Sequence, residues 1–266
     1  MAARDIVRQV VVISAFCFMI VAAMVGTGLL GGTPVQDLQD GALDADGSYL
    51  APATSAFSIW SVIYVGLFAY TVWQALPRQR ERSRQRALGW LIAGTMVLNG
   101  LWLVTAQFAT LPLTVAAIVA LLALLAVTFR RVVLQPGRGW ADALLIDGVT
   151  GLHLGWVTLA TVANTAAWLT TIVPEDAAAS ATLWGVLVLV VVAVIGVGIA
   201  WASHWRVAPG LAMAWGLVWI GVGRLAFEPE STPIGVTAIV VGVIVIAVPL
   251  VGTVVHRAAD VRNAEV

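Results

Sequence analysis

Lysine is absent from this chain of 266 residues, and charged side chains of any kind are scarce. The missing lysine excludes a retinal Schiff base, a pyridoxal phosphate site and a P-loop, because each of these needs a lysine amine. The only cysteine, Cys17, excludes an internal disulfide. The formal net charge of zero gives no sign of nucleic-acid binding.

What the chain does contain is apolar. Hydrophobic residues make up 61% of it and charged residues 11%, whereas a soluble domain is about 25% charged. The mean hydropathy is +0.97. The polar side chains are too few to cover a water-facing surface. We therefore expect the protein to lie in a lipid bilayer.

Long apolar segments recur along the whole chain. A membrane-spanning helix needs about 20 apolar residues. Eight segments approach this length: 8–31, 51–76, 88–109, 112–129, 142–172, 182–203, 209–227 and 233–255. We predict an all-α, polytopic membrane helical bundle with about eight transmembrane helices. Arg224, near the end of the seventh segment, is expected to snorkel or to pair with Glu228.

Arginine appears in every second connection between these segments. The loop at 32–50 is acidic and has no arginine, whereas residues 78–86 hold five arginines. Arginine also occurs in both terminal segments, so the positive-inside rule predicts an even number of spans with both termini in the cytoplasm. We expect the protein to lie in the inner or plasma membrane. The first apolar core, about 20 residues long, exceeds that of a signal peptide, so we expect it to be retained as a helix. We expect the 78–86 run to anchor the bundle at lipid headgroups.

Three segments carry aromatic side chains together with a hydrogen-bonding group at helical spacing. Residues three or four apart share a helix face. The first two stripes are Phe57, Trp60, Tyr64 and Phe68, and then Asn99 and Trp102. The third is His153, Trp156, Ala160, Asn164 and Trp168.

Simpler interpretations of these residues stay open. Tryptophan and tyrosine gather at both bilayer interfaces, and Asn99 and Asn164 are also suited to interhelical hydrogen bonds of about 0.6–2 kcal/mol. A lone histidine such as His153, without clustered partners, is a weak indication of a metal site. Asp147 is a candidate functional carboxylate inside the membrane, with pairing to Arg138 as the structural alternative.

The segments APATSAFSIWSVIY, LNGLW and HLGWVTLATVAN occur in this order, each in a different span. They resemble signature segments of the TspO/MBR family, the tryptophan-rich sensory proteins related to the translocator protein. The resemblance covers about residues 8–172, which would form a five-helix unit (1–172), followed by three further helices and a short cytoplasmic tail (173–266). The family's Pro-Tyr pair is replaced here by Leu152 and His153.

The resemblance implies a ligand pocket near the outer end of the first two helices. Family members bind porphyrins, haem-related tetrapyrroles and sterols, so we expect a hydrophobic small molecule, with an isoprenoid or carotenoid as an alternative. It implies no required cofactor and no metal. The expected ligand-binding residues are Pro52, Phe57, Trp60, Tyr64, Asn99, Trp102, His153, Trp156, Ala160 and Asn164. The oligomeric state is not carried over, because the extra helices are placed to cover a surface that five-helix members use to dimerise.

Three functions follow as hypotheses. The first is a membrane receptor or sensor for the ligand, and the second is a transporter of that ligand or another solute. The sequence shows no inverted repeat, which favours the first. Enzymatic, light-dependent porphyrin breakdown is the third hypothesis. No acid–base pair stands out for it, since Asp147 and His153 lie on different faces of one helix.

The last three helices carry no chemistry that the sequence reveals. They are rich in valine, glycine and alanine. Gly196 and Gly198 are expected to let neighbouring helices approach closely.

Overall fold

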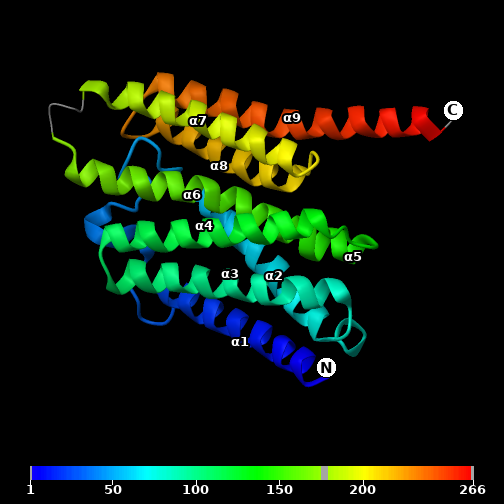
Figure 1. The fold of residues 1–266 in the computed structure, drawn as a ribbon. Helices are drawn as coiled ribbons and strands as arrows, with labels where there is room; N and C mark the ends of the chain where they lie inside the picture. Colours follow the sequence, from blue (N-terminus) through cyan, green and yellow to red (C-terminus); the bar gives the residue numbers. More distant parts are fainter. Residues whose placement is uncertain (1, 175–178, 265–266) are drawn as a thin grey trace.

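The computed structural model describes residues 2–174 and 179–264, which form a bundle of long helices (Figure 1). Eight of the described helices are long and apolar enough to cross a membrane. They are α1 (Ala2–Gly26), α2 (Ile59–Ala75), α3 (Ser83–Phe108), α4 (Leu111–Leu134), α6 (Val149–Ile172), α7 (Ala181–Ala202), α8 (Val207–Ala226) and α9 (Thr232–Ala264). The predicted all-α fold with eight spans is confirmed. Glu175 and Asp176, which make the fifth connection acidic, lie outside the described residues.

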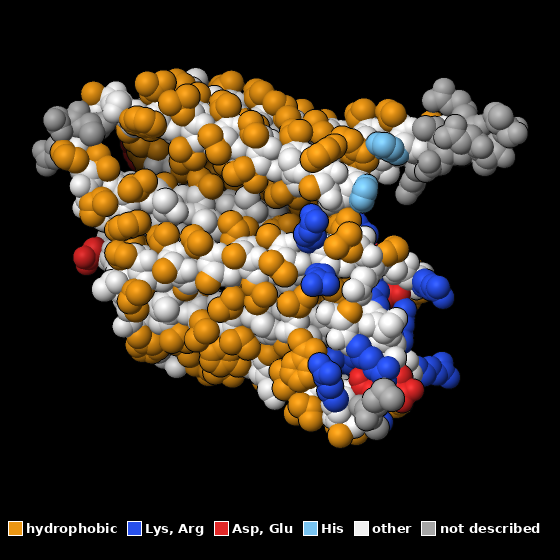
Figure 2. All heavy atoms as spheres, viewed as in Figure 1, with side chains coloured by type: hydrophobic (Ala, Val, Ile, Leu, Met, Phe, Trp, Pro, Cys, Tyr) orange, Lys and Arg blue, Asp and Glu red, His pale blue; other side chains and the backbone are white. Residues whose placement is uncertain are grey.

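The helices pack in a chain of neighbours across the bundle. α1 contacts α3, α3 contacts α4, α4 contacts α6, and α6 contacts α8, while α9 lies against both α7 and α8. α2 crosses behind this row and contacts α1 and α6 (Figure 1). The two chain ends lie at the same end of the bundle, as an even number of spans requires. Figure 2 shows arginine side chains gathered at that end, which we call the arginine-rich end.

The connection from α1 to α2 folds over the opposite end of the bundle. It contains the short 3-10 turns η1 (Val35–Asp37) and η2 (Gln39–Gly41). Gln39 and Asp40 both have φ of 55°, a left-handed conformation that is uncommon outside glycine and that reverses the chain tightly. The Gln39 side chain donates to the Ala109 carbonyl oxygen at 2.8 Å. The connection is thereby tied to the end of α3.

Ion pairs join separate helices at the arginine-rich end. Asp147 lies in the π-helical segment η5 (Ala143–Gly148) that precedes α6. Arg84 of α3 pairs with it, and so does Arg206, at 3.0 Å. The alternative pairing of Asp147 with Arg138 is therefore wrong. The π-helical turn offers a physical reason, because it changes the direction of the carboxylate relative to an uninterrupted helix.

Asp142 makes a second set of contacts beside the first. Its side chain is buried and accepts from Arg82 at 2.6 Å and from the backbone N–H of Arg138 at 2.8 Å. Arg84 lies 3.4 Å from its other oxygen. Arginines of the 78–86 run thus bind carboxylates of the bundle itself, beyond the expected role at headgroups.

Glycines set the closest helix contacts. A Cβ at Gly155 of α6 would lie 2.1 Å from the carbonyl oxygen of Pro209 in α8, so these backbones touch. Gly196 also lies at a close helix contact, as expected: a Cβ there would lie 2.6 Å from a side-chain methyl carbon of Val245 in α9. Gly198 has nothing within 4 Å, so the expectation for that glycine was wrong. The contact at Gly155 matters most here, because it fixes α8 beside Trp156.

Candidate ligand-binding pocket

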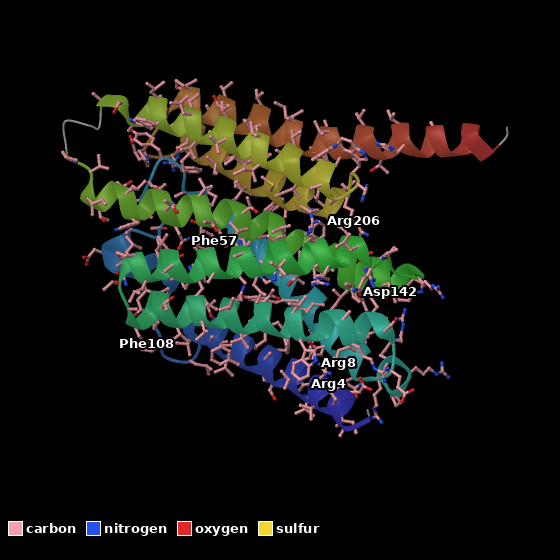
Figure 3. The ribbon with its side chains drawn as sticks, viewed as in Figure 1. Arg4, Arg8, Phe57, Phe108, Asp142 and Arg206 are labelled. Carbon is pink, nitrogen blue, oxygen red and sulfur yellow. The ribbon has the colours of Figure 1, made fainter. Side chains whose placement is uncertain are left out.

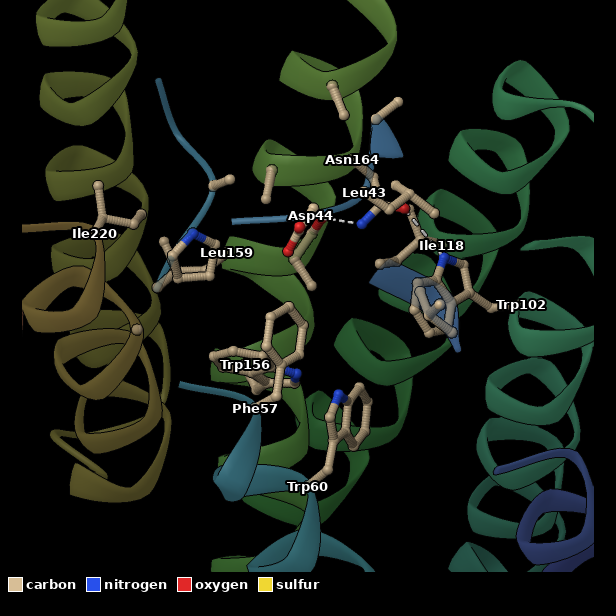
Figure 4. Close-up of a pocket in the computed structure, with 18 residues that line it drawn as sticks. Leu43, Asp44, Phe57, Trp60, Trp102, Ile118, Trp156, Leu159, Asn164 and Ile220 are labelled. Atoms are coloured by element: carbon tan, nitrogen blue, oxygen red, sulfur yellow. Dashed lines mark hydrogen bonds between the residues drawn. The ribbon is translucent and has the colours of Figure 1, made fainter. Parts of the chain in front are cut away.

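A chamber lies beneath the α1–α2 connection, at the end of the bundle opposite the arginine-rich end (Figure 4). It offers about 50 Å³ to water-sized molecules, which is room for a few waters. Its walls come from the connection, the start of α2, and the helices α3, α4, α6 and α8. They are Val35, Ala42, Leu43, Asp44, Ala51, Pro52, Phe57, Trp60, Trp102, Ile118, Trp156, Leu159, Ala160, Ala163, Asn164, Ala167, Gly216 and Ile220.

Aromatic rings from different helices meet edge to face at this chamber. Phe57, in the 3-10 turn η3 (Thr54–Ser58) that leads into α2, lies 6.0 Å from Trp156 with an interplanar angle of 81°. Trp60 lies 6.1 Å from the same indole at 83°, and stacks on Tyr64 at 5.2 Å. Such pairs add about 0.5–1.5 kcal/mol each beyond burial. The rings therefore support one another and form an apolar wall.

A hydrogen bond orients the tryptophan on the other side of the chamber. The indole N–H of Trp102 donates to the Asn164 side-chain oxygen at 3.2 Å, joining α3 to α6. The Asn164 amide nitrogen in turn donates to the Ala160 carbonyl oxygen at 2.8 Å. Because Asn164 is itself held by α6, the hydrogen bond keeps the Trp102 ring at the wall of the chamber (Figure 4).

A second polar chain runs behind the aromatic wall. The Tyr64 hydroxyl donates to the Asn99 side-chain oxygen at 3.2 Å, and the Asn99 amide nitrogen lies 3.3 Å from Nε2 of His153. With that amide as donor, Nε2 of His153 is the acceptor and its proton sits on Nδ1. Within residues 2–174 and 179–264 no three His, Cys, Asp or Glu side chains cluster as metal ligands would.

An outer groove adjoins the chamber and is much larger, at about 580 Å³. It lies between α1, α2, α3 and the α1–α2 connection. It shares two aliphatic residues, Val35 and Leu43, and the rings of Phe57, Trp60 and Trp102 with the chamber. Its other walls are Ile20, Ala23, Met24, Gly26, Thr27, Pro34, Gln36, Ser61, Tyr64 and Leu103. The three shared rings therefore separate a small inner space from a wide outer one.

The structure brings most of the expected ligand-binding residues together. Seven of them line the chamber: Pro52, Phe57, Trp60, Trp102, Trp156, Ala160 and Asn164. Tyr64 lines the groove, whereas Asn99 and His153 line neither space and form the polar chain behind the wall.

Phe68 does not belong to the aromatic face with which its spacing grouped it. Its side chain is 54% exposed and its ring lies 5.7 Å from Phe16 of α1. Two steps of four residues turn an α-helix by about 80° beyond two full turns. This drift carries Phe68 away from Trp60 and out of the pocket.

The sequence matches a known protein family over most of its length. The sequence matches the family described as TSPO-like protein over residues 8–251. The chain belongs to the TSPO-like family. The resemblance noted from the three motifs is thereby confirmed, and the match continues well past residue 172 into the three C-terminal helices. No curated protein and no solved structure matches the chain.

Helix α8 of this TSPO-like protein takes part in the pocket, which its sequence did not reveal. Gly216 and Ile220 line the chamber. The indole N–H of Trp215 donates to the Ala56 carbonyl oxygen at 2.9 Å. The backbone N–H of Ala53 donates to the Trp219 carbonyl oxygen at 3.1 Å. α8 thus holds the segment that carries Pro52 and Phe57. The division of the chain at residue 172 stays a prediction.

Arg224 of α8 ties down the α1–α2 connection. Its side chain is only 1% exposed. It donates to the Ser48 carbonyl oxygen at 3.0 Å and to the Ala45 carbonyl oxygen at 2.9 Å. The expected snorkelling or pairing with Glu228 is wrong, because the guanidinium instead donates hydrogen bonds to backbone carbonyls of the connection. An arginine inside an apolar segment was the signal in the sequence, but its partners were not readable there.

Few polar groups lie at the chamber of the TSPO-like protein. The Trp156 indole N–H is buried and has no hydrogen-bond partner among the described residues. Asp44 supplies the only charged side chain among the described lining residues, and one of its oxygens accepts from the Ala45 N–H at 2.7 Å. The chamber therefore combines mostly apolar walls with the polar side chains of Asp44 and Asn164, a pattern typical of small-molecule sites.

Proposed function

We propose that this TSPO-like protein is a membrane receptor or sensor that binds a hydrophobic ligand, and that the ligand is a tetrapyrrole such as a porphyrin or haem-related molecule. One observation carries the proposal: Trp60, Trp102 and Trp156, from three different helices, surround one chamber that adjoins a wide groove. Flat apolar molecules stack favourably on aromatic rings. We place the protein in the inner or plasma membrane with its arginine-rich end in the cytoplasm.

The volumes indicate how such a ligand would lie. The groove falls within the range of about 300–1,000 Å³ usual for ligand sites, whereas the chamber holds only a few waters. We place the body of the ligand in the groove against Trp60 and Tyr64, with one edge directed at the chamber. Phe57, which is 38% exposed and borders both spaces, is the ring that moves if the ligand goes deeper.

The charge of Asp44 limits the orientation of the ligand. A carboxylate group near Asp44 would be repelled by it. The carboxylates of a tetrapyrrole therefore point out through the groove, and its ring edge faces the chamber. An isoprenoid or carotenoid, the alternative ligand, carries no such constraint.

Titration of the purified protein with protoporphyrin, followed by quenching of tryptophan fluorescence, tests the proposal. Replacing Trp60 or Trp156 with alanine removes ring contacts worth about 1.5 kcal/mol, so each is expected to weaken binding about ten-fold. Trp184→Ala is the matched control, since Trp184 lies on α7 and is 63% exposed. An equal effect of all three substitutions, or no effect of any, refutes the proposed wall.

A transporter is the second candidate, and flux into proteoliposomes separates it from a receptor. Ion pairs of Arg84 and Arg206 with Asp142 and Asp147 join separate helices at the arginine-rich end. These bonds between helices favour binding over passage through the bundle. Saturable ligand movement that scales with the amount of protein would support transport instead. Illumination of the porphyrin complex tests the enzymatic alternative, which predicts a new absorbing product.

A further inference from the structure

A second cleft lies at the arginine-rich end, between the first turns of α1 and α3. Its space is about 470 Å³, and it is lined by Arg4, Asp5, Arg8, Ser83, Arg86, Ala87 and Trp90. Figure 3 labels Arg4 and Arg8 on α1 at this end. Three arginines face a single aspartate here, so the cleft is positively charged.

Arg8 is buried in this cleft with unused donors. Its side chain is 1% exposed, and its stem packs on Gly89 of α3, where an added Cβ would lie 2.8 Å from the Arg8 Cδ. Nη2 donates to the Arg80 carbonyl oxygen at 3.0 Å. Nε and Nη1 have no hydrogen-bond partner among the described residues, and Nη1 lies 4.0 Å from Asp5. A buried guanidinium with free donors favours an anion beside it.

The one carboxylate in the cleft, Asp5, is already bound by one of the three arginines. Arg86 binds Asp5 through two hydrogen bonds, from Nε at 2.8 Å and from Nη2 at 2.6 Å. This bidentate pair leaves Arg8 and Arg4 less fully neutralised. The geometry thus keeps positive charge available despite the nearby aspartate.

Two helix N-termini add to the positive potential. α1 and α3 run parallel, and both begin at this cleft. The N-cap residue of α3, Arg82, makes no side-chain capping bond, so the first-turn N–H groups beginning at Ser83 have no side-chain cap. A helix N-terminus carries about half a positive charge and favours phosphate.

We propose that this cleft binds the phosphate of an anionic phospholipid headgroup. Its ligand chemistry is that of a phosphate group, and its position indicates that a lipid supplies it. Trp90 at the cleft is 38% exposed, and Ile6 and Val7 beside it on α1 are 44% and 52% exposed, as expected of side chains at the bilayer surface. Basic pockets between transmembrane helices are a known form of headgroup site.

Native mass spectrometry of the purified protein with phosphatidylglycerol or phosphatidylcholine tests this inference. We expect the protein to bind phosphatidylglycerol at least about five-fold more tightly, and Arg4→Gln and Arg8→Gln each to weaken that binding about five-fold. Arg131→Gln is the matched control, because Arg131 is an exposed arginine on α4 at the same end. Asp5→Asn removes the opposing charge and is expected to tighten binding, a change that damage to the fold would not produce.

The contrary results are equally definite. Equal binding of the two lipids, or equal weakening by Arg4→Gln and Arg131→Gln, would show unspecific attraction and overturn the proposal. Inorganic phosphate or glycerol phosphate at millimolar concentration is expected to leave lipid binding unchanged. Displacement of the lipid by either of them would instead assign the cleft to a soluble anion.

Discussion

Arg224 gives the sharpest test of how α8 controls the pocket. Methionine at this position keeps most of the apolar volume but removes both hydrogen bonds to the α1–α2 connection. A hydrogen bond from a charged donor contributes about 1.5 kcal/mol or more, so the two together hold the connection with about 3 kcal/mol. Local opening of the connection should then become about 100-fold more frequent.

Hydrogen exchange of the connection measures this opening. Its amides are protected by local bonds such as Asp44 N–H to the Gly41 carbonyl oxygen and Gly47 N–H to the Asp44 carbonyl oxygen. Peptides covering residues 38–51 should exchange about 100-fold faster in Arg224→Met, and those of α4 should not change. Arg131→Met at the other end is the control. Unchanged exchange in 38–51 would refute the role of Arg224, whatever happens to the melting temperature, because methionine also removes the cost of burying a guanidinium.

Three further substitutions follow from the same contacts. Gly155→Ala pushes a methyl group into the Pro209 carbonyl and should lower the free energy of unfolding by about 2 kcal/mol. Gly198 has open space around it, so Gly198→Ala should not lower that free energy. Equal losses of stability in thermal unfolding would contradict this. Gly216→Leu fills the chamber, where an added Cβ would already lie 2.7 Å from a leucine methyl group. The substitution should abolish any ligand contact with the chamber. Unchanged porphyrin affinity would place the ligand in the groove alone. Asp147→Asn weakens two ion pairs at the arginine-rich end and should destabilise the bundle by about 3 kcal/mol without changing ligand affinity, as unfolding and titration of the same sample would show.

The spans were predictable because crossing a membrane is a local property of the chain. A helix in lipid needs only length and apolar side chains, and both are visible in a window of 20 residues. The aromatic stripes were readable for the same reason. Spacing alone put Trp60 and Tyr64 on one face of the second span, and Trp156 and Asn164 on one face of the fifth.

Contacts between distant segments were not readable in this way. Arg224 binds carbonyls about 180 residues earlier in the chain. Every residue has a backbone carbonyl, so the sequence does not show which of them an arginine will bind. For Asp147, the sequence suggested the near neighbour Arg138 as the structural alternative, but the carboxylate pairs with Arg84 and Arg206. In both cases the charged residue was recognised and its partner was not, because the partner depends on how helices pack.

Photo-crosslinking of a bound ligand tests the central claim most directly. A porphyrin or isoprenoid carrying a diazirine group would be activated in the purified protein, and the modified residues identified by mass spectrometry. If the rings of α2, α3 and α6 hold the ligand, its adducts should concentrate on Phe57, Trp60, Tyr64 and Trp102 and disappear in the presence of excess unlabelled ligand. Adducts confined to the exposed outer faces of α7 and α9, and insensitive to that competitor, would contradict the claim.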